Sequence, residues 1–66
     1  MNAFSEKIAA VLEANGGAPL TISSIAVLVG GGASRVAAAL TALEARKRVV
    51  KVAHKTYAAA PKEATS

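Results

Sequence analysis

Two runs of glycine divide this chain of 66 residues into segments with helical periodicity. Asn15 is followed by Gly16 and Gly17, and a second run occupies residues 30–32. Glycine adopts the left-handed backbone conformation without steric cost, and this conformation commonly ends helices. Each run therefore predicts the end of a helix, and we expect short helices joined by tight connections.

The segment before the first run has one apolar helical face. Its apolar residues recur at positions i, i+4, i+7 and i+8: Phe4, Ile8, Val11 and Leu12. This spacing predicts a helix over residues 3–15. Either Asn2 or Ser5 is expected to cap its N-terminus.

The segment between the two runs begins with a short extended connector. Pro19 disfavours the helical conformation for the residue before it, so residues 18–20 are expected to be extended. Thr21 then stands at an N-cap position. Apolar residues follow at helical spacing and predict a helix over residues 22–29: Ile22, Ile25, Ala26 and Val29.

The segment after the second run predicts a longer helix. Apolar residues recur at Val36, Leu40 and Leu43, which indicates a helix over residues 33–47 with Ser34 as its candidate N-cap. Positively charged side chains close this segment, where they would offset the helix dipole: Arg46, Lys47 and Arg48.

Beyond this helix the periodicity changes to that of strands. Residues 49–53 and 56–58 predict a hairpin with His54 and Lys55 in the turn, although this pair is not preferred turn chemistry. The predicted fold is therefore α+β: mainly α, with three helices and a small β-hairpin, in one domain over residues 1–60. A disordered tail is expected over residues 61–66.

The residue inventory excludes several ways to stabilise a small domain. The sequence has no Cys and a single His, so disulfides and a zinc site are both ruled out. Natural domains below roughly 70–80 residues commonly need such support or a partner chain. Association with a second copy is the route that remains.

The same inventory argues against an enzyme. The sequence has no Asp, and Ser34, His54 and Glu44 are the only basis for a Ser–His–carboxylate set, which their spacing does not support. The glycines at 30–32 are not followed by the Gly-Lys-Ser/Thr of a phosphate loop. We therefore expect no catalysis, no cofactor, no metal and no small-molecule ligand.

Membrane insertion and export are not expected either. The longest stretch without a polar or charged side chain, residues 25–33, is far shorter than the roughly 20 residues that span a bilayer. Glu6 and Lys7 interrupt the N-terminal apolar residues, which is unlike a signal peptide. The expectation is a cytoplasmic protein, associated with the nucleoid if it binds DNA.

Positive charge is concentrated in the second half of the chain. The net charge is +4, and seven of the eight Lys and Arg residues lie after residue 33. Such asymmetry favours a surface for a polyanion, with nucleic acid as the first candidate. A basic surface that serves only solubility is the alternative that charge alone leaves open.

The segment 21–43 carries a more specific pattern. Ala26 permits a close helix crossing, and Gly30, four residues later, supplies a positive φ for the turn. Val36, six residues after Gly30, is expected to pack back against the first of the two helices. Other apolar residues fill the wedge between the helices: Ile25, Val29, Ala39 and Leu40. This spacing resembles the helix-turn-helix pattern.

With the preceding helix and the following hairpin, residues 4–60 resemble the winged helix-turn-helix family. The resemblance implies that the helix over 33–47 is a recognition helix for the DNA major groove and that the hairpin is the wing. Members of the family mostly bind DNA, often as transcriptional regulators, and some bind RNA or proteins. This chain departs from the family at Ser24, where Glu is common, and at Lys47, where Gly is common. Lys47 must adopt a positive φ, or the helix must end differently.

The resemblance carries over to a set of candidate contacts. The predicted base contacts are Ser34, Arg35 and Thr41, on a helix whose other outward residues are alanine. The predicted phosphate contacts lie at the start of the helix over 22–29 and on the wing: Thr21, Ser23, Ser24, Lys51, His54 and Lys55. With so few base contacts, we expect weak sequence preference for each subunit.

Two apolar residues stand where the family is usually polar. Val27 and Leu28 are expected to form an exposed patch for self-association or for another protein, unless the helix is rotated to bury one of them. A homodimer would enlarge the core and double the DNA contacts. The alternative function is a winged-helix module for protein–protein interaction that docks through this patch.

Overall fold

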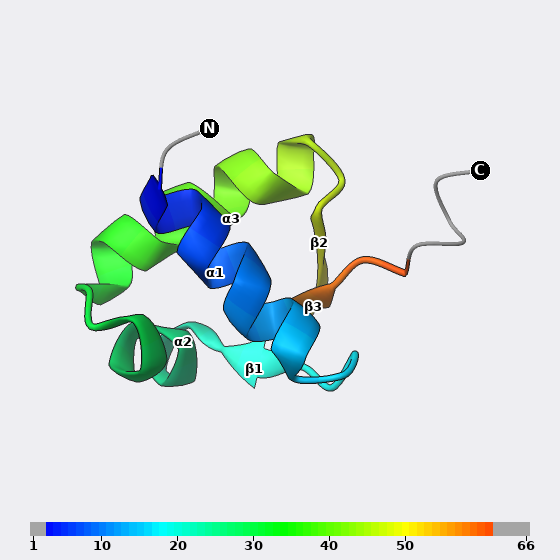
Figure 1. Cartoon of the computed structure of the whole chain (residues 1–66), viewed down its shortest axis with the longest axis horizontal. Helices are drawn as coiled ribbons and strands as arrows, with labels where there is room; N and C mark the ends of the chain where they lie inside the picture. The colour runs from blue at the N-terminus through cyan, green and yellow to red at the C-terminus, as the bar shows by residue number, and fades with distance from the viewer. Residues whose placement is uncertain (1–2, 62–66) are drawn as a thin grey trace.

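The computed structural model describes residues 3–61. Figure 1 shows the order of its helices and strands. These elements are α1 (Ala3–Ala14), β1 (Leu20–Thr21), α2 (Ile22–Val29), α3 (Ala33–Ala45), β2 (Val49–Ala53) and β3 (Thr56–Ala59). Three helices and a three-stranded antiparallel sheet confirm the predicted α+β fold class.

The helices bury the predicted apolar stripes against one another. The side chains with almost no exposure come from all three helices and from β2: Ile8, Leu12, Ile25, Val36, Leu40, Leu43 and Val49. Tyr57 of β3 closes the core on the sheet side at 6% exposure. Full burial of each large aliphatic side chain contributes about 1.5–3 kcal/mol, so this cluster is the main source of stability.

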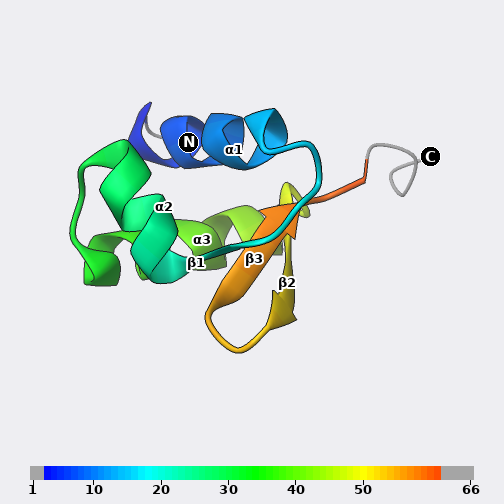
Figure 2. The same ribbon diagram turned by 90° about the horizontal axis from the view of Figure 1, so that it is seen from below.

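The sheet contains one strand more than the predicted hairpin. The strand order is β1-β3-β2, with Leu20 opposite Tyr57 and Thr21 opposite Thr56. The end of the predicted extended connector therefore pairs with the far end of the chain. Figure 2 shows the hairpin of β2 and β3 projecting away from α1, with β1 beside β3.

Both ends of α2, and the turn that joins it to α3, form as predicted. The Thr21 hydroxyl accepts a hydrogen bond from the Ser24 amide at 3.1 Å and caps α2. Gly30 ends the helix with φ 76°, and its amide donates to the Ala26 carbonyl at 2.9 Å. The direction of the chain changes by 105° between α2 and α3.

Several predicted helix ends are corrected. α3 ends at Ala45, because Lys47 adopts the left-handed conformation with φ 63°, so the three cations follow the helix instead of forming its last turn. The N-cap of α3 is Gly32 and not Ser34, and it makes no side-chain capping bond. Ser5 lies buried inside α1 and is not its cap, whereas Asn2 lies outside the described residues.

The ends of the chain are described only in part. Pro61 is exposed and outside regular structure, and the rest of the predicted disordered tail, residues 62–66, lies outside the described residues. Over residues 3–61, no single helix is long and apolar enough to cross a membrane. Within these residues, α2 and α3 taken together have the length and the apolar composition of a membrane span, but the pair is sharply bent.

Candidate nucleic-acid interface

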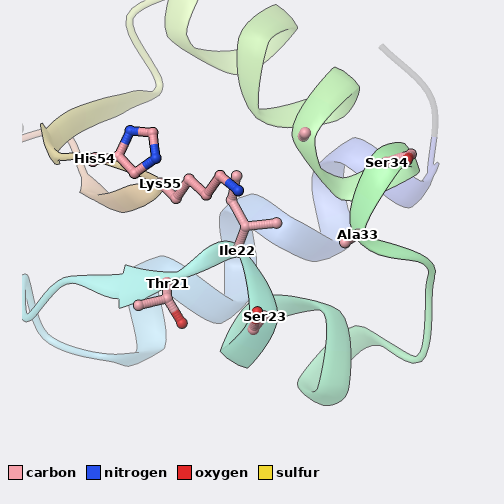
Figure 3. Close-up of a pocket in the computed structure, with 8 residues that line it drawn as sticks. Thr21, Ile22, Ser23, Ala33, Ser34, His54 and Lys55 are labelled. Atoms are coloured by element: carbon pink, nitrogen blue, oxygen red, sulfur yellow. The ribbon is translucent and has the colours of Figure 1, made fainter.

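An open hollow of about 530 Å³ lies where the start of α2, the start of α3 and the hairpin turn meet (Figure 3). Five of the nine predicted contact residues line it: Thr21, Ser23, Ser34, His54 and Lys55. The remaining lining residues are small or aliphatic: Ile22, Ala33 and Ala37. The hollow thus combines hydroxyl groups, one ammonium group and one imidazole from three separate segments.

The hairpin turn is held against α2 by its backbone. The Ile22 amide donates to the Lys55 carbonyl at 3.0 Å, and the Thr56 hydroxyl donates to the His54 carbonyl at 2.9 Å. Lys55 adopts φ 54°, the left-handed conformation that this tight turn requires. The bond from Ile22 explains why His54 and Lys55, which follow the end of α2 by 25 and 26 residues, lie beside its first turn.

The amides at the start of α2 are less free than the sequence predicts. The Ile22 amide is bonded to Lys55, and the Ser24 amide is bonded to the Thr21 hydroxyl. The Thr21 hydroxyl itself donates to the Ser24 hydroxyl at 3.1 Å. Of these first three amides of the helix, only that of Ser23 has no hydrogen bond within residues 3–61. Ser24 does not line the hollow.

The outward face of α3 is small and uncharged. One exposed line along the helix consists of Ser34, Ala38, Thr41 and Ala45, and the charged Arg35 and Glu44 are exposed to either side of it. The Thr41 hydroxyl donates to the Ala37 carbonyl at 3.0 Å, but its oxygen retains the capacity to accept. Such a face allows another molecule to approach the helix backbone closely, yet it offers few groups that distinguish one base from another.

Arg35 lies on the flank of α3 that faces α1, apart from the hollow. Its guanidinium carbon is 4.2 Å from the centre of the Phe4 ring. The same ring also packs against Gly31, where an added Cβ would lie only 2.7 Å from a ring carbon. An exposed cation–π contact is worth only about 0.5–1 kcal/mol, so this contact is a weak restraint on Arg35.

Arg48 has a structural role that the sequence did not reveal. Its guanidinium donates two hydrogen bonds to the Glu6 carboxylate, at 3.1 and 3.2 Å, and lies 3.9 Å from Glu13. The hydrogen bond from Arg48 holds the pKa of Glu6 below its ordinary value of 4.5, and the same bond raises the pKa of Arg48. Arg48 thus joins the segment after α3 to α1.

The other predicted residues lie outside the hollow. Lys51 is exposed on β2, opposite Tyr57 of β3. Val27 and Leu28 are exposed to 82% and 58%, which confirms the expected exposed apolar pair. Val50 and Val52 are also exposed, at 37% and 52%, and the sequence analysis did not single them out. Alternation of Val and Lys ordinarily places the valines on the buried face of a strand, so the sequence pattern gave no signal for the exposure of Val50 and Val52.

The described residues hold no metal-binding cluster, because no three His, Cys, Asp or Glu side chains come together among them. Ser34 and His54 share the hollow, but Glu44 is not among its lining residues. Comparison of the chain with known protein families, curated proteins and solved structures finds no match.

Proposed function

We propose that this chain is a winged helix-turn-helix protein that binds double-stranded DNA and serves as a transcriptional regulator or accessory factor inside the cell. In this proposal α3 enters the major groove, the start of α2 meets the DNA backbone, and the hairpin of β2 and β3 is the wing. The observation that carries the proposal is the convergence of five predicted contact residues on one hollow.

The chemistry of the hollow supports a phosphate as its occupant. Ser23 offers a hydroxyl and an unbonded amide at a helix N-terminus, where the helix dipole favours an anion. Lys55 adds a positive charge from the wing, and Ser34 adds a hydroxyl from α3. Ser23 and Lys55, both predicted phosphate contacts, fix a phosphate without reading sequence, and Ser34, a predicted base contact, lies beside them.

The position of the charges supports the same proposal. Arg35 on α3 and Lys51 on the wing are both exposed cations outside the hollow, on the two elements that the proposal brings to the DNA. To reach DNA, Arg35 would give up only its weak cation–π contact with the Phe4 ring. If these two residues and Lys55 each neutralise one phosphate, log Kd varies with log salt with a slope of about 3.

The uncharged outer face of α3 supports weak sequence preference. We expect a single subunit to bind random duplex DNA with Kd of roughly 1–100 µM at physiological salt, the range of non-specific binding. Sequence selection would then need two subunits on a repeated site.

The experiment is a fluorescence-anisotropy titration of a labelled random-sequence duplex at several salt concentrations. Lys55→Ala and Arg35→Ala should each weaken binding and lower the salt slope by about 1. Lys7→Ala is the matched control, because it removes the same charge from an exposed site on α1 that does not line the hollow. Binding that is absent at low salt, or that responds equally to all three changes, would refute the proposal.

A second candidate function is favoured by the exposure of Val27 and Leu28. The chain would then be a winged-helix interaction module that docks another protein on α2, with the basic half assisting. Replacing both residues by Gln should abolish docking and leave DNA affinity unchanged. A double variant that retains every partner would remove this candidate.

A further inference from the structure

We propose that the exposed apolar face of α2 is a homodimer interface, on which a second copy of this chain packs through the same residues. Val27 is the most exposed large apolar side chain of the described residues, at 82%, and Leu28 follows at 58%. The neighbouring Ile25 and Val29 are turned into the core. The inference concerns the same surface as the second candidate function but makes a second copy of this chain, and not another protein, its occupant, and it is independent of DNA binding.

The distribution of charge favours a second copy as the occupant. Between Glu13 and Arg35 the sequence has no charged residue, and this stretch contains β1, α2 and their connections. A two-fold interface places a surface patch against its own copy, so any cation near the axis meets another cation. In a chain with net charge +4, the face of α2 lets two molecules meet without opposing like charges.

The other exposed apolar residues are less suited to self-association. Val50 and Val52 flank Lys51 on β2, which is an edge strand. The pairing of β2 with β3 is also irregular between Lys51 and Ala53. Lysine and bulges on an edge strand oppose pairing with a second strand. A two-fold arrangement through β2 would moreover bring Lys51 close to its own copy.

The proposed interface leaves the DNA-facing hollow open. The α2 residues that line the hollow are its first two, Ile22 and Ser23. Val27 and Leu28 lie in the C-terminal half of the helix and do not line it. One chain can therefore carry both surfaces at the same time.

The interface is small, so the dimer is weak. A helix of eight residues is about 12 Å long. A standard stable interface buries about 800 Å² on each partner, which is close to a fifth of the 4051 Å² exposed here. One helix pair buries less than that, and we expect a dissociation constant between about 10 µM and about 1 mM.

The test is sedimentation equilibrium of the full chain over that concentration range. The wild type should approach twice the 6.6 kDa mass of the chain. Val27→Lys and Val27→Glu should each raise the dissociation constant about tenfold or more, because each places like charges at the two-fold axis. An equimolar mixture of the two variants should dimerise again, since the opposite charges then meet. Val52→Lys is the control, because it adds the same charge at another exposed valine outside α2.

Circular dichroism of each variant establishes that the monomer is folded. A wild type that stays at 6.6 kDa up to about 1 mM overturns the proposal. Dimerisation that persists in Val27→Lys, or that is lost equally in Val52→Lys, overturns the assigned surface. A mixture that stays monomeric overturns the proposed contact between Val27 and its own copy. No DNA is present in this assay, so failure here is separate from failure of the DNA-binding proposal.

Discussion

Replacing each glycine of the run at 30–32 by serine should give three different results from one kind of substitution. Gly30 has φ 76° and no heavy atom near the position of an added Cβ. Gly31 has a Phe4 ring carbon 2.7 Å from that position. Gly32 is the N-cap of α3, with φ −74° and ψ 151°, and has open space around it.

The expected magnitudes follow from these geometries. At Gly30 the left-handed conformation costs an L-residue about 1–2 kcal/mol. The smaller entropy of the unfolded chain returns about 0.4–1 kcal/mol, so the net loss is about 1 kcal/mol. At Gly32 the serine fits the backbone and supplies the missing side-chain cap, so Gly32→Ser should stabilise by about 0.5–1 kcal/mol.

At Gly31 the effect should depend on Phe4. The added Cβ displaces the ring and breaks its contact with Arg35, so Gly31→Ser should destabilise by about 1 kcal/mol. In a Phe4→Ala background this loss should disappear, because no ring remains to be displaced. The loss at Gly30 should remain in the same background, because it comes from the backbone.

Urea denaturation and thermal melts followed by circular dichroism measure these differences. For a domain of this size, 1 kcal/mol shifts Tm by about 4–8 °C. Equal effects at the three positions would refute the reasoning, as would destabilisation by Gly32→Ser. Failure of Phe4→Ala to relieve Gly31→Ser would show that the ring does not determine the need for glycine there.

Three further predictions concern the rest of the fold. Leu40→Ala should cost about 2–5 kcal/mol, measured by urea denaturation, because Leu40 is fully buried between the helices; a loss below about 1 kcal/mol would contradict its place in the core. Thr21→Ala should cost about 1 kcal/mol through loss of the α2 cap, and retention of full stability in a thermal melt would contradict that role. The Glu6–Arg48 pair lowers the pKa of Glu6 in the folded state, so its contribution is present above pH 4.5 and is lost as the pH falls through the lowered value. Stabilities of the wild type and Glu6→Gln should therefore converge on acidification, and a difference that persists at pH 2–3 would refute this linkage.

The assignment of the basic residues changes once the structure is known. From the sequence, Arg46, Lys47 and Arg48 were equivalent cations at the end of a helix. In the structure Lys47 makes the turn and Arg48 is bonded to Glu6, which is 42 residues away. The residues that remain on the side of the hollow are Lys55 and His54. Neutralising the charge of Lys55 on the wing should therefore lower DNA affinity, whereas neutralising Arg48 after α3 should mainly lower stability.

The sequence by itself determined the presence of three helices, the N-cap of α2 at Thr21, the turn at Gly30 and the hairpin. Each of these features depends on interactions within a few residues, such as an apolar repeat or the freedom of glycine at positive φ. The exposure of Val27 was also predictable, because the core-facing positions of a short helix leave the opposite side to solvent.

Only the tertiary structure decided which distant segments meet. The two-residue strand β1 is too short to have a sequence pattern, and it exists because Thr21 pairs with Thr56. The same pairing places His54 and Lys55 at the start of α2 and so creates the hollow. The contacts of Arg35 with Phe4 and of Arg48 with Glu6 likewise join residues more than 30 positions apart. Such contacts follow from the packing of the whole chain, and no local periodicity encodes them.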